Sequence, residues 1–223
     1  MREGYLRTAT DSTALGFASP DFPHAPDDRV QALAVLNDWA EPAEYDALRQ
    51  NLARVRQASP YMERYVLEAL MRMGYGADAV ARMRERYAAM IASDLTTLWE
   101  GWGIGAEGFG GGTYNHAWSG GPLTVMSQRI AGLEPAELGW GRYRVAPQLS
   151  GLDSVEAWAP TPAGELRVRW RREGKAIEGA ISAPAKLEGE LVVPEGRRVW
   201  VDGVEAGAGT VALGGGVVEV RVE

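Results

Sequence analysis

The spacing of apolar residues divides the chain into two parts. From about Asp27, apolar residues recur every three or four positions, which is the period of a helix with one buried face. After Gly139 the period falls to two, which is typical of strands with one buried face. We therefore expect a loop-rich segment over 1–26, a helical domain over 27–138 and a strand domain over 139–223.

Start signals predict five helices in the first part. Asp27 and Asp28 are typical N-caps for the first helix, and the second follows Pro42. Ser59 precedes Pro60, the combination of an N-cap and a proline at the first helical position. The remaining two helices are expected from about Ala77 and from about Pro122, the latter ending at Gly132.

Alternating apolar and charged residues predict an antiparallel β-sandwich over residues 140–223, with about seven or eight strands. The segments ELRVRW (165–170) and VVEVRV (217–222) alternate as half-buried strands do. Asp202-Gly203 lies between two apolar pairs and predicts a hairpin turn. The arginines of this half alternate with apolar residues, so they are expected on solvated strand faces.

The composition of the chain excludes several classes of binding partner and of metal site. The 23 Lys and Arg residues against 30 Asp and Glu residues give a net charge of −7, and no basic stripe occurs, so nucleic acid and anionic membranes are poor partners. The absence of cysteine excludes disulfides and thiolate metal sites. No apolar run reaches the roughly 20 residues of a membrane span, and the amino terminus has no hydrophobic signal region. We expect a cytoplasmic chain without cofactor or metal.

The segment 96–122 carries the candidate chemistry. It gathers one carboxylate, three tryptophans and one of the two histidines of the chain: Glu100, Trp99, Trp102, Trp118 and His116. Aromatic faces beside a carboxylate suit a sugar-binding cleft, since pyranose C–H groups pack on indole and acid–base chemistry needs an oxygen nearby. The alternative is a packed loop with core tryptophans. The glycine run 108–112 favours a loop around a ligand.

Several ordered motifs resemble a known family. They are DDRVQALAVL (27–36), SPYMERYVLEAL (59–70), TTLWEGW (96–102) and NHAWSGGP (115–122), followed by APQLSGL (146–152) and TPAGELRV (161–168). In this order they resemble bacterial α-L-rhamnosidases of glycoside hydrolase family 78. The resemblance covers essentially the whole chain. It implies the all-α half of an (α/α)6 toroid followed by an antiparallel β-sandwich, and the inverting hydrolysis of α-L-rhamnosides.

The resemblance also implies roles for individual residues. Glu100 of the TTLWE motif corresponds to the general base of the family, and His116 of the NHAWS motif to a sugar contact. Asn115 belongs to the same motif and is a candidate substrate contact. Trp99, Trp102 and Trp118 fall where aromatics line the family's pocket, although Trp99 and Trp118 fit the protein core equally well.

The general acid of the family has no counterpart in the sequence. It lies upstream in the barrel, and nothing before Asp27 matches its motif, so the chain is expected to be a truncated form. Inversion needs two carboxyl groups about 6.5–9.5 Å apart with water between them. Asp27, Asp28, Glu63 and Glu107 are other acids near the motifs. Helix capping is the favoured role of the first two, and a solvated surface position that of Glu63 and Glu107.

Three functions are compatible with these observations. The first is a rhamnosidase-type hydrolase, or the base-bearing half of one, acting on a small-molecule glycoside. The second is a truncated relic that hydrolyses small activated esters or glycosides weakly. The third is a carbohydrate-binding or assembly module without catalysis, against which we note that residues 171–223 contain no exposed aromatic cluster beyond Trp200.

A half barrel would leave apolar edges uncovered. Leu33, Val35, Leu36 and Trp39 lie on the helix nearest the cut. Exposed apolar patches of more than a few hundred Å² usually mark an interface, and a two-fold dimer is the simplest way to cover one. The sequence therefore predicts a homodimer. The alternative is a monomer in which residues 1–26 cover this edge.

Overall fold

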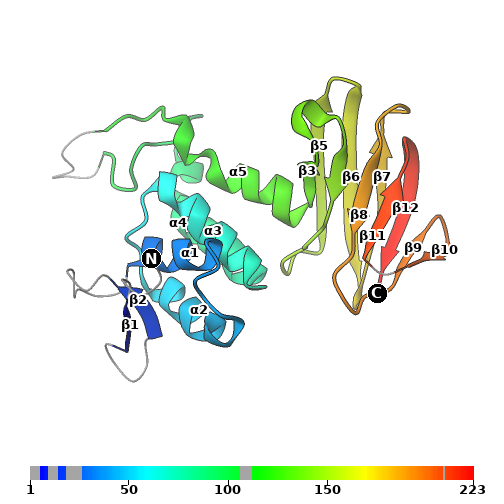
Figure 1. The fold of residues 1–223 in the computed structure, drawn as a ribbon. Helices are drawn as coiled ribbons and strands as arrows, with labels where there is room; N and C mark the ends of the chain where they lie inside the picture. The colour runs from blue at the N-terminus through cyan, green and yellow to red at the C-terminus, as the bar shows by residue number, and fades with distance from the viewer. Residues whose placement is uncertain (1–5, 10–14, 19–26, 106–111, 208) are drawn as a thin grey trace. The chain divides into compact units, whose positions relative to one another are not determined.

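The structure is a computed structural model that describes residues 6–9, 15–18, 27–105, 112–207 and 209–223. The chain forms two compact units, Met1–Val125 and Met126–Glu223. The first unit contains the α-helices and the second contains two β-sheets (Figure 1).

The helices of the first unit follow the predicted start signals. In the described residues they are α1 (Asp28–Leu36), the 3₁₀ turn η2 (Pro42–Glu44), α2 (Tyr45–Arg54), α3 (Pro60–Arg72), α4 (Gly76–Ala92), the 3₁₀ turn η3 (Ala117–Gly120) and α5 (Gly121–Val125). The Asp27 side chain accepts a hydrogen bond from the Arg29 amide, and Ser59 Oγ accepts one from the Met62 amide. These two caps confirm the predicted beginnings of α1 and α3.

The N-terminal segment contains a strand pair where the sequence predicted only loop. β1 (Leu6–Ala9) and β2 (Leu15–Ala18) pair antiparallel. The side chain of Gln31 on α1 fixes β2, because its Oε1 accepts from the Phe17 amide at 2.7 Å and its Nε2 donates to the Phe17 carbonyl at 2.8 Å. Phe17 and Gln31 are 14 residues apart in the sequence, so no local pattern predicted that the Gln31 side chain would bind this strand.

A buried ion cluster joins three helices of the first unit. Arg82 on α4 donates to both carboxylate oxygens of Glu63 on α3, and its Nη2 also donates to Asp28 Oδ2 on α1 at 2.6 Å. Its Nη1 donates to the carbonyls of Leu52 and Val55, at the end of α2. Burial lowers the pKa of Arg82, but the hydrogen bonds with Glu63 and Asp28 outweigh it and raise this pKa.

Two predictions about acids are therefore wrong. Asp28 and Glu63 are both 0 % exposed. Asp28 does not cap α1, because Asp27 occupies that position, and Glu63 is not a solvated surface residue. Both carboxylates are retained inside the unit because the Arg82 guanidinium donates hydrogen bonds to each of them and Arg86, 3.6 Å from Glu63, supplies a second positive charge. Without such partners a buried charge is unstable. Glu107 lies outside the described residues.

The second unit consists of two sheets. The six-stranded sheet has the order β10-β9-β12-β7-β6-β5 and the four-stranded sheet the order β11-β8-β4-β3. The strands are β3 (Leu133–Pro135), β4 (Tyr143–Val145), β5 (Ser154–Thr161), β6 (Gly164–Glu173), β7 (Ala176–Ala183), β8 (Gly189–Val192), β9 (Val199–Val201), β10 (Val204–Ala206), β11 (Thr210–Leu213) and β12 (Gly216–Val222). The unit also contains the π-helix η4 (Met126–Ile130) and the 3₁₀ turn η5 (Leu138–Trp140).

Alternation along the strands produces the core of this unit. Leu166, Val168 and Trp170 of β6 are all buried, and the Trp170 indole N–H donates to the Ala131 carbonyl at 2.9 Å. The intervening arginines lie on the opposite face, where Arg169 pairs with Glu156 of β5 at 3.0 Å. The predicted strands at 165–170 and 217–222 and the solvated position of the arginines are confirmed.

The Asp202-Gly203 hairpin is also confirmed. These two residues join β9 and β10, and both have positive φ, +50° and +77°. This conformation twists a two-residue turn in the same sense as its strands.

The sandwich differs from the prediction in the number of strands and in one pairing. The described part of residues 140–223 forms nine strands, β4 to β12, where about seven or eight were expected. β4 and β8 run parallel, with Tyr143 opposite Gly189, whereas an antiparallel arrangement was expected throughout. A side chain at position 189 would meet the Tyr143 ring at 2.5 Å, so glycine allows this close pairing. The second unit begins at Met126, before the period change at Gly139, because η4 and β3 belong to it. The half toroid implied by the resemblance stays a prediction.

Replacing Arg82 by Met tests the ion cluster. The change removes the hydrogen-bond donors that Arg82 gives to both buried carboxylates and leaves Arg86, 3.6 Å from Glu63, as the nearby positive charge, so we expect a loss of about 3–5 kcal/mol of unfolding free energy. The measurement is chemical denaturation of the helical unit, followed by circular dichroism. Arg84→Met, at an exposed position of the same helix, is the control and should change stability by less than about 0.5 kcal/mol. Equal effects of the two substitutions would contradict this assignment.

The homodimer stays a prediction. The apolar surface that could form its interface on α1 is smaller than the sequence suggested. Val35 is 1 % exposed, and Leu36 and Trp39 are half-buried, so Leu33 at 40 % is the exposed member of the expected patch. If the chain dimerises through α1, Leu33→Lys should lower the mass measured by light scattering from that of two chains to one. The control is Leu123→Lys, at an exposed position of α5. A wild-type mass of one chain at every concentration would refute the dimer.

Candidate functional site

Two segments on either side of the glycine run are joined by main-chain hydrogen bonds. The Glu100 amide donates to the Thr113 carbonyl at 2.9 Å, and the His116 amide donates to the Leu98 carbonyl at 2.8 Å. The Thr97 hydroxyl donates to the Tyr114 carbonyl. These bonds hold the carboxylate of one segment beside the histidine of the other.

Thr113 links Glu100 to His116. Oε2 of Glu100 accepts from the Thr113 amide at 2.9 Å and lies 3.2 Å from the Thr113 hydroxyl. That hydroxyl lies 3.1 Å from His116 Nδ1, which is itself 3.7 Å from Glu100 Oε2. The Glu100 side chain is 34 % exposed, so its carboxylate is both positioned and open to water.

Aromatic rings continue the site from His116. The rings of His116 and Trp118 lie 4.2 Å apart, and the Trp118 indole N–H donates to the Glu100 carbonyl at 3.3 Å. Tyr61 of α3 lies 5.4 Å from Trp118, and Tyr65 lies one turn further along the same helix, 5.9 Å from Tyr61. Trp118 and Tyr61 are 43 % and 44 % exposed, which leaves apolar ring surface available to a ligand.

The other two tryptophans face the core. Trp99 is 8 % exposed and belongs to a small cluster with Tyr87, Met90 and Ile104. Trp102 packs against this cluster, and its indole N–H donates to the Ala58 carbonyl at 2.8 Å. The sequence left a core position open for both Trp99 and Trp118. Trp99 takes the core position, whereas Trp118 is exposed.

Glu100, His116 and Trp118 thus come together, whereas Trp102 makes its contacts elsewhere. Trp99 packs in the core and also contacts the second segment, since its ring lies 5.4 Å from that of Tyr114 and its carbonyl accepts from the Ser119 hydroxyl. Asn115 is exposed between Tyr114 and His116. Residues 108–111 of the glycine run lie outside the described residues. Two residues of this site were not predicted from the sequence: Thr113, which connects the acid to the histidine, and Tyr61. A tyrosine four residues before Tyr65 on a helix was the available signal, since such residues share one face.

Most of the acids that could have supplied a second carboxylate beside Glu100 bind other groups. Asp27 caps α1, and Asp28 and Glu63 bind Arg82, so three of the four acids that the sequence offered have other partners. In the part of the chain that the structure describes, no group of three or more His, Asp or Glu side chains is arranged to hold a metal ion. Nor does any described helix have the length and apolarity to cross a membrane.

This arrangement suits the activation of water. Two Thr113 donors occupy Oε2 of Glu100, and Oε1 remains to accept a proton. A positioned, water-accessible carboxylate is what a general base requires. The Trp118 and Tyr61 rings beside it offer the apolar faces on which sugar C–H groups pack.

One family model matches part of the chain. Residues 132–208 match the sequence model of the bacterial alpha-L-rhamnosidase C-terminal domain. No curated protein sequence is matched by the chain.

Solved structures resemble a larger part of the chain. The alpha-L-rhamnosidase from Dictyoglumus thermophilum has a TM-score of 0.76 at 20 % identity, over 100 % of this chain and 27 % of that chain. The Streptomyces avermitilis alpha-L-rhamnosidase complexed with L-rhamnose has a TM-score of 0.65 at 19 % identity, over 88 % and 21 %. A rhamnosidase of glycoside hydrolase family 78 from Bacillus sp. GL1 has 0.65 at 25 % identity, over 86 % and 22 %. The chain thus spans about a quarter of the length of these proteins.

Hydrogen exchange at Thr113 tests the geometry around Glu100. In Glu100→Ala the Thr113 amide loses its charged acceptor, and a hydrogen bond of this kind contributes about 1.5–3 kcal/mol. We expect its exchange, followed by NMR, to accelerate about tenfold or more. The His116 amide is an internal control, because its acceptor is the Leu98 carbonyl. Unchanged exchange at Thr113 would contradict the described contact.

Proposed function

Since the chain resembles the C-terminal part of the α-L-rhamnosidases of glycoside hydrolase family 78, we propose that its helical unit carries the water-activating half of an inverting glycosidase site. The single observation that carries this proposal is the Glu100 carboxylate, oriented by Thr113 and open to water beside His116 and Trp118. The substrate class is a glycoside with a terminal α-L-rhamnosyl group.

In the proposed reaction, water donates a proton to Glu100 and attacks the anomeric carbon from the face opposite the leaving group. The His116 ring and the Trp118 face orient the sugar. Thr113 fixes the orientation of the Glu100 carboxylate. Its amide and hydroxyl donate to Oε2, so that Oε1 receives the proton.

Complete inversion also requires an acid that protonates the leaving oxygen. Of the acids named from the sequence, Asp27, Asp28 and Glu63 have the partners given above and do not fill this role. We therefore expect efficient turnover only for substrates with stable anionic leaving groups, such as para-nitrophenyl α-L-rhamnoside. An alkyl rhamnoside should react very slowly.

A sugar-binding role without catalysis is the second candidate. This role is favoured by the fact that Asp27, Asp28 and Glu63 bind other groups. A carboxylate beside aromatic rings can bind sugar hydroxyl groups without a second carboxyl group to act as the general acid. The two candidates differ in whether product forms.

Glu100→Gln distinguishes them. If Glu100 is the base, the substitution should lower the turnover of para-nitrophenyl α-L-rhamnoside by about 10²–10⁴-fold, because glutamine cannot accept the proton. The control is Asp94→Asn, which neutralises an exposed acid shortly before the site and should leave turnover unchanged. Turnover by Glu100→Gln at the wild-type rate would remove Glu100 from the mechanism. Binding of L-rhamnose without turnover of any substrate would favour the second candidate.

A further inference from the structure

The outer face of the six-stranded sheet carries a row of polar and aromatic side chains. Register places Trp200 of β9 opposite Arg221 of β12, and Arg221 opposite Glu178 of β7. Val220 and Val222, the neighbours of Arg221, are buried in the core, so the row points to the outer face. None of its members belongs to the site around Glu100.

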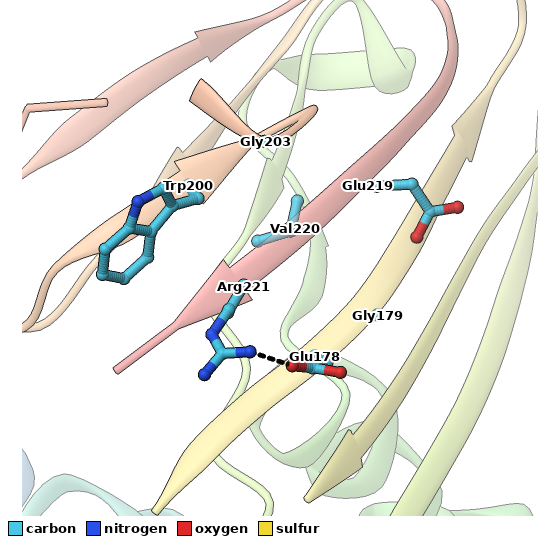
Figure 2. A pocket seen from close by; sticks show the side chains of 7 residues that line it. All are labelled: Glu178, Gly179, Trp200, Gly203, Glu219, Val220 and Arg221. Atoms are coloured by element: carbon cyan, nitrogen blue, oxygen red, sulfur yellow. Dashed lines mark hydrogen bonds and ion pairs between the residues drawn. The ribbon is translucent and has the colours of Figure 1, made fainter. Parts of the chain in front are cut away.

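A hollow of about 360 Å³ lies over these strands, within the range of small-molecule sites. Figure 2 shows Trp200 on the left, Glu219 on the right, and the Arg221–Glu178 pair below them in the view. Gly203 of the β9–β10 hairpin lines it without a side chain, and a Cβ there would meet open space.

The lining combines one aromatic ring with separate donors and acceptors. Arg221 Nη1 donates to Glu178 Oε1 at 2.6 Å, and its Nε and Nη2 donate to Glu223 Oε1, which fixes the guanidinium and leaves one N–H on Nη1 and one on Nη2 for a ligand. Glu219 is exposed, and among the described residues its carboxylate has no hydrogen bond or ion pair. An ionised carboxylate is an acceptor only, with room for two hydroxyl donors.

We propose that this hollow binds a neutral saccharide. The Trp200 indole would pack on the C–H face of the sugar, while Glu219 accepts from its hydroxyl groups and Arg221 donates to its ring or hydroxyl oxygens. This site lies on the strand unit and does not depend on the function proposed for Glu100.

Charge decides between a saccharide and a cationic ligand. An aromatic ring among carboxylates also suits a quaternary ammonium group. Here, however, the Arg198 guanidinium already lies over the Trp200 ring, 5.0 Å from its centroid, so a cationic ligand would compete with it for the ring, whereas a neutral polyol meets no like charge. Both guanidinium groups are themselves paired with carboxylates, Arg198 with Glu223 and Arg221 with Glu178 and Glu223.

NMR titration of the full chain tests the proposal at the residue concerned. Trp200→Phe assigns the Trp200 indole N–H signal by its disappearance. Methyl α-L-rhamnoside, methyl α-D-glucoside and methyl β-D-galactoside are the probes. We expect at least one of them to shift this signal saturably, with a dissociation constant on the order of 1 mM. Glu219→Ala, at an exposed strand position, should weaken that binding about tenfold.

Two control variants separate this site from its surroundings. Trp158→Phe changes another exposed tryptophan of the same sheet, 57 % exposed on β5 and outside the hollow, and should leave the affinity unchanged. Glu100→Gln should also leave it unchanged, even if it abolishes turnover, so failure of the proposed function would be distinguishable from failure of this site.

Three outcomes would overturn the proposal. The first is a Trp200 signal that does not move with any of the glycosides up to about 100 mM. The second is an affinity that Glu219→Ala leaves unchanged. The third is choline chloride shifting the Trp200 signal at lower concentration than any of the glycosides.

Discussion

The arrangement of the helical unit depends on the guanidinium of Arg82. Through it, α4 is bonded to Asp28 of α1, to Glu63 of α3 and to the carbonyl groups that end α2. Arg86, one turn later, extends the cluster: its Nε lies 3.6 Å from Glu63 Oε2, and its guanidinium lies 4.3 Å from the Trp102 ring centroid. Burial lowers the pKa of Arg86, which the nearby Glu63 carboxylate partly offsets. The ion cluster is thus connected, side chain by side chain, to the segment that presents Glu100.

This connection explains why the candidate site combines rigid and open parts. Trp102 is held by the Ala58 carbonyl and by Arg86, and Trp99 is packed in the core. Glu100 lies between these two anchored residues in sequence, yet its own side chain reaches water. A general base needs this combination, because a mobile carboxylate would lose orientation and a buried one would lose its water.

Local signals in the sequence predicted much of the fold. Ser59-Pro60 and Asp27 fix helix beginnings through short-range hydrogen bonds, and Asp202-Gly203 fixes a turn through backbone conformation, so neighbouring residues were sufficient. Asp28 was misread as a helix cap and Glu63 as a solvated surface residue, because the arginine that binds both lies far along the chain from Asp28 and on another helix from Glu63. For the same reason composition could not separate Trp99 from Trp118, since burial depends on which helix packs against each ring. Thr113 has no motif of its own, and only the pairing of two segments reveals its contacts.

The parallel pairing of β4 with β8 has a consequence for synthesis on the ribosome. β3 and β4 pair locally, but the other edge of β4 waits for a strand that begins at Gly189, more than forty residues later. At translation rates of about 5–20 residues per second, this interval lasts a few seconds. Meanwhile the β5–β6–β7 meander can assemble from adjacent hairpins. The nascent chain therefore carries an unpaired strand edge beside a growing sheet, the kind of template that other strands bind when nothing covers it.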